Sequence, residues 1–146
     1  MTTTAGTATL ENVVLFHFDR PFAGSGLVVP MAHAQGVLDC INRRIARAPL
    51  IGQVGYPGDP HDVLLTKATH AVTEARLEGS QLVGTVKILD TIPGRELQKL
   101  IEAEAYVAFR PSMSGNHDKE RNEFAPKMVN GIHAITSSAE EPWGGQ

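Results

Sequence analysis

Residues 71–88 read AVTEARLEGSQLVGTVKI and contain the clearest structural pattern of the chain. From Ala71 to Leu77, small or apolar residues occupy alternate positions, and the Glu78-Gly79-Ser80 triplet that follows is typical of a turn. Beyond the turn, every second residue from Leu82 to Ile88 is apolar or glycine, as in a strand with one face toward a core. The stretch therefore predicts a β-hairpin.

Two helices are predicted on either side of this hairpin. Upstream, residues 31–47 have apolar residues at helical spacing, and Pro49 would end the helix. Its buried face is expected to consist of Val37, Leu38, Ile41 and Ile45. Downstream, Leu97, Leu100 and Ile101 predict a second helix over residues 95–104, after a break at Pro93-Gly94.

Short apolar runs at 13–18, 106–109 and 129–137 predict further strands. Strands and helices without a regular strand-helix-strand rhythm indicate an α+β fold. With 146 residues in all, the chain suggests one domain, over residues 11–137. We expect a flexible N-terminal arm over 1–10, a disordered or partner-ordered loop over 111–127, and a tail over 138–146 that contains the single tryptophan, Trp143.

Composition excludes several classes of function. The net charge is −3 and the isoelectric point is about 6.0, so the sequence does not suggest a surface for nucleic acid or anionic membrane. Cys40 is the only cysteine, and the histidines do not show the spacing of a metal site. The glycine-rich stretches lack the lysine of a phosphate loop, and no apolar run is long enough for a bilayer span. We therefore expect no metal, no cofactor and no membrane anchor, and synthesis in a cytoplasm.

Four segments follow one another in an order that resembles a known family. They are Gly52-Gln53-Val54-Gly55-Tyr56-Pro57, Ala68-Thr69-His70-Ala71-Val72-Thr73, Ile88-Leu89-Asp90-Thr91-Ile92-Pro93-Gly94-Arg95 and Val107-Ala108-Phe109-Arg110-Pro111-Ser112-Met113-Ser114-Gly115. The prohead proteases of tailed phages, which are related to the herpesvirus assemblins, have Gly-Glu-Leu-x-His-Pro, Ser-His-x-Ile-Thr, Ile-Leu-x-Thr-Pro-x-Gly and Gly-Val-Ser-Ser-Arg-Gly-x-Gly segments in the same order. The resemblance spans residues 27–137 and implies a small β-barrel-like mixed sheet flanked by helices.

The same alignment places unsuitable residues at the catalytic positions. The base histidine of the family falls on Tyr56, whose phenol titrates near ~10, and the nucleophilic serine falls on Arg110, which is always protonated. His70 matches the second histidine of the family, and the acidic third member falls on Thr136. The resemblance therefore implies a catalytically inactive relative without catalytic residues.

One alternative keeps the chemistry. A nucleophile needs a base within hydrogen-bond reach, and His70 with Ser112 is such a pair if the fold brings them together. The other interpretation is that His70 is a strand residue with satisfied hydrogen bonds and that Ser112 and Ser114 are ordinary polar residues of a loop.

A retained fold without its catalytic residues points to a new use of the surface. We expect a structural protein of a phage head, a cement or decoration protein bound to the lattice of the major capsid protein and present in the virion. Trp143 is the expected anchor, and contacts between copies of the chain are left open. Two alternatives are a maturation serine protease with a rearranged active site and an internal scaffold or head assembly factor.

Overall fold

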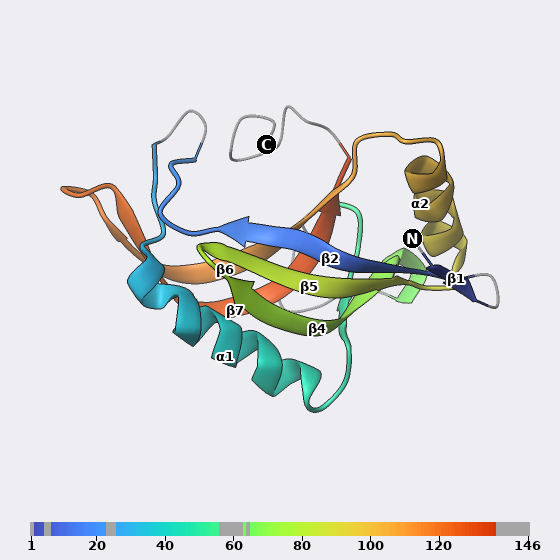
Figure 1. The fold of residues 1–146 in the computed structure, drawn as a ribbon, viewed down its shortest axis with the longest axis horizontal. Coiled ribbons are helices and arrows are strands. Elements are labelled where there is room, and N and C mark those ends of the chain that lie inside the picture. Colours follow the sequence, from blue (N-terminus) through green and yellow to red (C-terminus); the bar gives the residue numbers. More distant parts are fainter. Residues whose placement is uncertain (1, 5–6, 23–25, 56–62, 64, 137–146) are drawn as a thin grey trace.

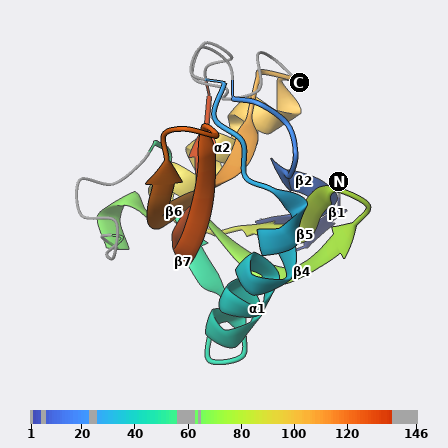
Figure 2. The same cartoon turned by 90° about the vertical axis from the view of Figure 1, so that its left-hand side faces the viewer.

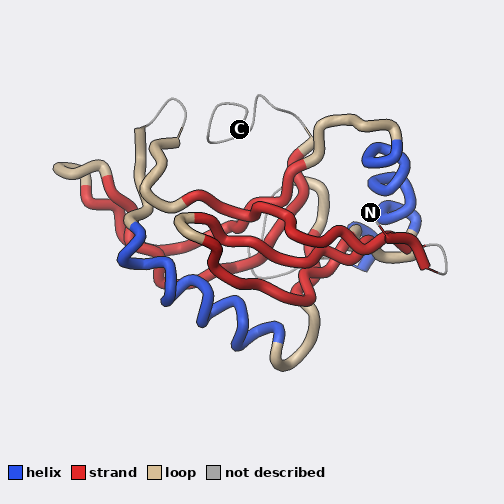
Figure 3. Tube along the Cα trace, viewed as in Figure 1, coloured by secondary structure: helices blue, strands red, loops and turns tan. Residues whose placement is uncertain are grey.

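The computed structural model describes residues 2–4, 7–22, 26–55, 63 and 65–136, which form an α+β fold of two antiparallel sheets and two α-helices (Figures 1 and 3). This confirms the fold class. Tyr56 and Trp143 lie outside the described residues. In chain order the elements are β1 (Thr2–Thr4), β2 (Thr7–His17), the 3₁₀ turn η1 (Met31–His33), α1 (Ala34–Ile45), β3 (Leu50–Gly52), the 3₁₀ turn η2 (Leu65–Lys67), β4 (His70–Glu78), β5 (Gln81–Ile88), α2 (Ile92–Glu102), β6 (Ala108–Asp118) and β7 (Glu123–Ile135).

The predicted hairpin is the centre of the larger sheet. β4 and β5 pair antiparallel, with Val72 opposite Val86 and Leu77 opposite Leu82, and the strand order is β1-β2-β5-β4-β3. Gly79 adopts a φ of +59° in the turn, a conformation that glycine reaches without strain. A bulge at Thr73 breaks the expected alternation, so that Val72 is buried while Thr73 is exposed.

Helix α1 confirms the predicted amphipathic segment, with η1 as its first turn. Ala34, Val37 and Ile41 are buried, whereas Leu38 and Ile45 are only partly buried against the core. The helix packs on β4 and β7, and it lies along one side of the sheets while α2 lies beyond their far end (Figure 2). The predicted burial of all four aliphatic residues is therefore correct for only two of them.

Helix α2 begins three residues before its predicted start. The Thr91 side chain accepts a hydrogen bond from the Gly94 amide at 3.0 Å, which is the usual cap of a helix N-terminus. Pro93 lies within the first turn, where a proline does not interrupt the helix. The same Thr91 hydroxyl donates to the Ala68 carbonyl at 2.6 Å and fixes the helix start against the segment before β4.

Residues 111–127 are a hairpin, so the prediction of a disordered loop is wrong. β6 and β7 pair over their whole length, and Asp118 closes the turn by accepting hydrogen bonds from the amides of Glu120 and Arg121. Val28 adds a short parallel bridge, donating to the Asn122 carbonyl and accepting from the Phe124 amide. These long-range main-chain hydrogen bonds order the segment although its side chains are polar, and the prediction considered only the side chains.

The N-terminal segment is also part of a sheet. Thr2–Thr4 pairs with the first residues of β2, and Leu10 lies opposite Val86 of β5. Ala8 is fully buried. The described part of segment 1–10 is therefore sheet rather than the expected flexible arm, because backbone pairing does not need the apolar alternation that the segment lacks.

The two sheets curl toward each other without forming a closed barrel among the described residues. On one side, the chain after β3 joins β7, since the Ala134 amide donates to the Gln53 carbonyl at 2.9 Å and the Gly55 amide donates to the Ala134 carbonyl at 2.8 Å. On the other side, β6 contacts β2, and Arg110 Nη1 donates to the Val14 carbonyl at 2.9 Å. The core between them takes residues from both sheets and both helices.

Candidate functional site

His70 lies at the start of β4 with both ring nitrogens hydrogen-bonded. Nε2 is 2.7 Å from the Ile132 carbonyl oxygen, which only accepts, so Nε2 carries the proton. Nδ1 is 2.7 Å from the Thr69 hydroxyl and therefore accepts from it in the neutral ring. The side chain is fully buried, and its ring meets Phe109 edge-on at 4.8 Å.

This environment makes His70 a weak base. Its pKa is lowered from 6.5 to about 4, chiefly by burial and to a smaller extent by the neighbouring His133, and the Ile132 hydrogen bond opposes this shift only in part. The hydrogen bond between the Thr69 hydroxyl and a ring nitrogen of His70 resembles that between a nucleophile and its catalytic base. A catalytic base works best with a pKa near the working pH, so an imidazole with a pKa of about 4 gives little activation at neutral pH.

His133 is a second buried histidine that the sequence pattern did not single out. It lies on β7, and its Nδ1 accepts a hydrogen bond from the Gln53 amide at 3.2 Å. Burial, followed by the charge of Arg44, lowers its pKa to about 4. Gly131 lies two residues earlier on the same strand face, and a Cβ there would lie 2.7 Å from His133 Nε2. The sequence feature that could have indicated a buried His133 is the glycine two positions before it in an apolar strand.

Arg110 is buried at the seam between β6 and β2. Only 5% of the residue is exposed, and Nη1 donates to the carbonyls of Val14 and Phe109 at 2.9 Å each. Arg110 lies opposite His133 in the β6–β7 register. His133 thus lies between Arg110 on the neighbouring strand and the Gln53 amide on its other side, and the Arg110 guanidinium donates hydrogen bonds to the main chain.

The alternative pair of His70 and Ser112 is not in hydrogen-bond contact in the described part of the chain. Residues 109–112 alternate along β6, so Phe109 and Ser112 project from opposite faces, and it is Phe109 that meets the His70 ring. Ser114 accepts a hydrogen bond from the Asn130 amide group at 2.8 Å. Both nitrogens of His70 already have partners.

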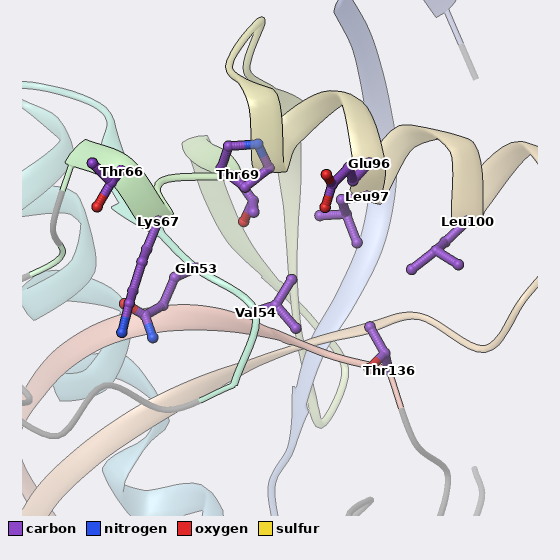
Figure 4. Close-up of a pocket in the computed structure, with 10 residues that line it drawn as sticks. Gln53, Val54, Thr66, Lys67, Thr69, Glu96, Leu97, Leu100 and Thr136 are labelled. Atoms are coloured by element: carbon purple, nitrogen blue, oxygen red, sulfur yellow. The ribbon is translucent and has the colours of Figure 1, made fainter.

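An open cavity of about 400 Å³ adjoins this cluster (Figure 4). Thr69 lies between His70 and the cavity, because its hydroxyl binds the His70 ring and Thr69 also lines the cavity. Thr136, the residue after β7, is exposed and also lines the cavity. The walls are Gln53, Val54, Thr66, Lys67, Thr69, Pro93, Glu96, Leu97, Leu100 and Thr136.

The described residues contain no group of three or more histidine, cysteine, aspartate or glutamate side chains placed to hold a metal ion. None of the helices in this part of the chain combines the length and apolar character that a bilayer span requires.

Comparison with known proteins gives a likeness of fold. No protein-family model matches the chain, and no curated protein matches it. Among solved structures, the capsid assembly protease gp21 of bacteriophage T4 superposes with a TM-score of 0.63 at 16% sequence identity, covering 89% of this chain and 91% of that protein. The chain shares the fold of a capsid assembly protease. At this identity the likeness extends to the fold and not to the activity.

Proposed function

We propose that this protein is a structural component of a phage head, a cement or decoration protein that binds the lattice of the major capsid protein. The fold likeness to a capsid assembly protease supports a role in the head. The observation that favours a structural role over proteolysis is Arg110. It stands at the position that aligns with the nucleophilic serine, and its guanidinium is buried and hydrogen-bonded to two main-chain carbonyls.

The histidines support the same interpretation. A serine protease needs an imidazole that gains a proton during the reaction, and the pKa values of His70 and His133 are lowered to about 4. The two nitrogens of His70 bind the Ile132 carbonyl and the Thr69 hydroxyl, and Nδ1 of His133 binds the Gln53 amide. These contacts stabilise the junction of β3, β4 and β7.

The experiment is an inventory of purified mature heads. A cement protein is present at a copy number that matches the capsid lattice, and heads assembled without it rupture at a lower temperature, because it binds only the assembled lattice. An assembly factor would be present in precursor heads and missing from mature ones. Absence from both kinds of particle would contradict a role in the head.

Proteolysis is the second candidate, favoured by the activity in the name of the T4 protein. Its test is labelling of the purified protein with a serine-directed fluorophosphonate. We expect no labelling. Stoichiometric labelling at Ser112 or Ser114 that is lost in His70→Ala would favour a protease with a rearranged active site.

A further inference from the structure

The cavity beside Thr69 has an apolar interior that opens to solvent. Leu97 is 1% exposed, while Val54 and Leu100 are 43% and 42% exposed and point into the cavity from two walls (Figure 4). Large hydrophobic side chains with this much exposure are few in the described chain, and two of them line this one cavity. Its volume falls in the range of about 300–1,000 Å³ typical of binding pockets.

The main chain of Val54, which borders the same cavity, is paired on one side only. The Gln53 carbonyl and the Gly55 amide both bond to Ala134 of β7. Because successive residues of a strand direct their main-chain groups to opposite sides, the amide and carbonyl of Val54 point away from β7. Neither group has a hydrogen-bond partner among the described residues.

The missing partner of Val54 follows from the path of β4. The Thr69 amide donates to the Gly52 carbonyl at 3.0 Å, and this is the last bond between the two strands in that direction. The preceding residues, Leu65–Lys67, form η2 and leave the strand direction. An open strand edge attracts another extended chain, since each unpaired group gains a hydrogen bond by pairing.

Charges of opposite sign stand on the walls. Lys67 projects from η2 on one side and Glu96 from α2 on the other (Figure 4). Both residues are exposed, and neither forms an ion pair within the described part of the chain. An occupant with an acidic group near Lys67 and a basic group near Glu96 is complementary to them.

We propose that the Val54 edge and this cavity bind an extended peptide segment of a capsid protein. The segment pairs its main chain with the amide and carbonyl of Val54 and inserts an apolar side chain between Val54 and Leu100. Main-chain pairing combined with a side-chain pocket is a general mode of peptide recognition. The identity of the partner as a capsid protein rests on the proposed function, whereas the binding of an extended peptide does not.

Peptide binding is tested by selecting a random 12-residue display library on the immobilised full-length protein and measuring the enriched peptides by fluorescence anisotropy. Val54→Glu and Leu100→Glu place a charge in the apolar pocket and should raise the Kd by about tenfold or more. Ile51→Glu is the matched control, because Ile51 is 41% exposed, lies three residues from Val54 and does not line the cavity. It should leave the Kd unchanged. Melting temperatures establish that all three variants are folded.

Two results would overturn the peptide site. One is a library without enrichment on the wild-type protein, and the other is an equal loss of affinity in Ile51→Glu and Val54→Glu. N-methylation of single amides in an enriched peptide adds a readout of main-chain pairing. A sharp loss at one position is expected, and a flat profile would contradict pairing with Val54.

A second experiment, which measures binding to purified heads, distinguishes failure of this proposal from failure of the proposed function. Purified heads that lack the protein should bind the wild type and the Ile51→Glu variant, and should bind Val54→Glu poorly. Heads that bind all three equally contradict the assignment of this cavity to the capsid while leaving the cement function standing. Heads that bind none contradict the cement function, and the library result still decides whether the cavity takes a peptide.

Discussion

Arg110 Nη1 donates a hydrogen bond to the main-chain oxygen of Val14 over 2.9 Å and so ties β6 to the open edge of β2. The two strands contact each other but belong to different sheets. The arginine at the position that aligns with the nucleophile therefore stabilises the seam of the fold. Replacing Arg110 should therefore change the free energy of unfolding, and this change has to be measured before any effect on activity is interpreted.

The first prediction is that Arg110→Met destabilises the domain by about 1–3 kcal/mol, measured by urea unfolding. The methionine keeps the apolar packing of the stem but removes the donor to Val14 and Phe109, and a buried carbonyl that loses its partner costs about this much. Arg47→Met, on an exposed arginine, should stay within about 0.5 kcal/mol. A more stable Arg110→Met would mean that the cost of burying the guanidinium exceeds its hydrogen bonds.

Gly52 and Gly36 provide a matched pair for the second prediction. A Cβ on Gly52 would overlap the Ile132 carbonyl oxygen and the ring of His70, whereas a Cβ on Gly36 meets nothing. Gly52→Ala should cost at least about 3 kcal/mol or prevent folding, because main chain and a buried ring must move. Gly36→Ala, in the exposed face of α1, should stabilise by about 0.5–1 kcal/mol. Similar thermal shifts for both would contradict the close packing at His70.

The third prediction concerns pH. His70 and His133 have folded-state pKa values of about 4, below the ordinary value of 6.5. Between these values the unfolded chain binds more protons than the folded one, so stability is full above pH 6.5 and falls as the pH drops toward 4. Each histidine can remove up to about 3 kcal/mol across this window.

Urea unfolding at a series of pH values between 7.5 and 4.5 measures this dependence. His133→Gln should lose part of the slope even if its stability at pH 7.5 is lower. His117→Gln, on an exposed histidine of the β6–β7 hairpin, should keep the slope of the wild type. A wild-type stability that does not change from pH 7 to pH 5 would mean that neither buried histidine resists protonation.

The parts of the fold that the sequence predicted are those set by local pattern. The β4–β5 hairpin and both helices show their period over consecutive residues, and both capping and turn residues lie within a few positions. The β6–β7 hairpin was missed because residues 114–121 are exposed and polar, so no alternation marks them. The pairing of Val28 with the start of β7 joins residues about 95 positions apart, which no local pattern shows. For the same reason the Gln53–His133 contact was not foreseeable, although His70 was singled out.

The fourth prediction separates two positions on α1 that the periodicity treats alike. Ile41 is fully buried, whereas Leu38 is only partly buried. Ile41→Ala should cost about 2–5 kcal/mol. Leu38→Ala should cost clearly less, since part of its surface already faces water. Equal losses in urea unfolding would show that the helix is rotated relative to the described packing.

The last prediction concerns Trp143, for which the proposed function suggests a role in binding. The described residues fill a core from both sheets and both helices, and the fully buried side chains include Phe18, Leu15 and Ile41. Tryptophan is among the residues that most often dominate binding energy. Trp143→Ala, or deletion of residues 138–146, should therefore weaken binding to expanded capsids while the melting temperature of the free protein stays nearly constant. A large fall in melting temperature with unchanged affinity per folded molecule would place Trp143 in the packing of the domain. The cavity at Val54 would then be the only proposed contact with the capsid.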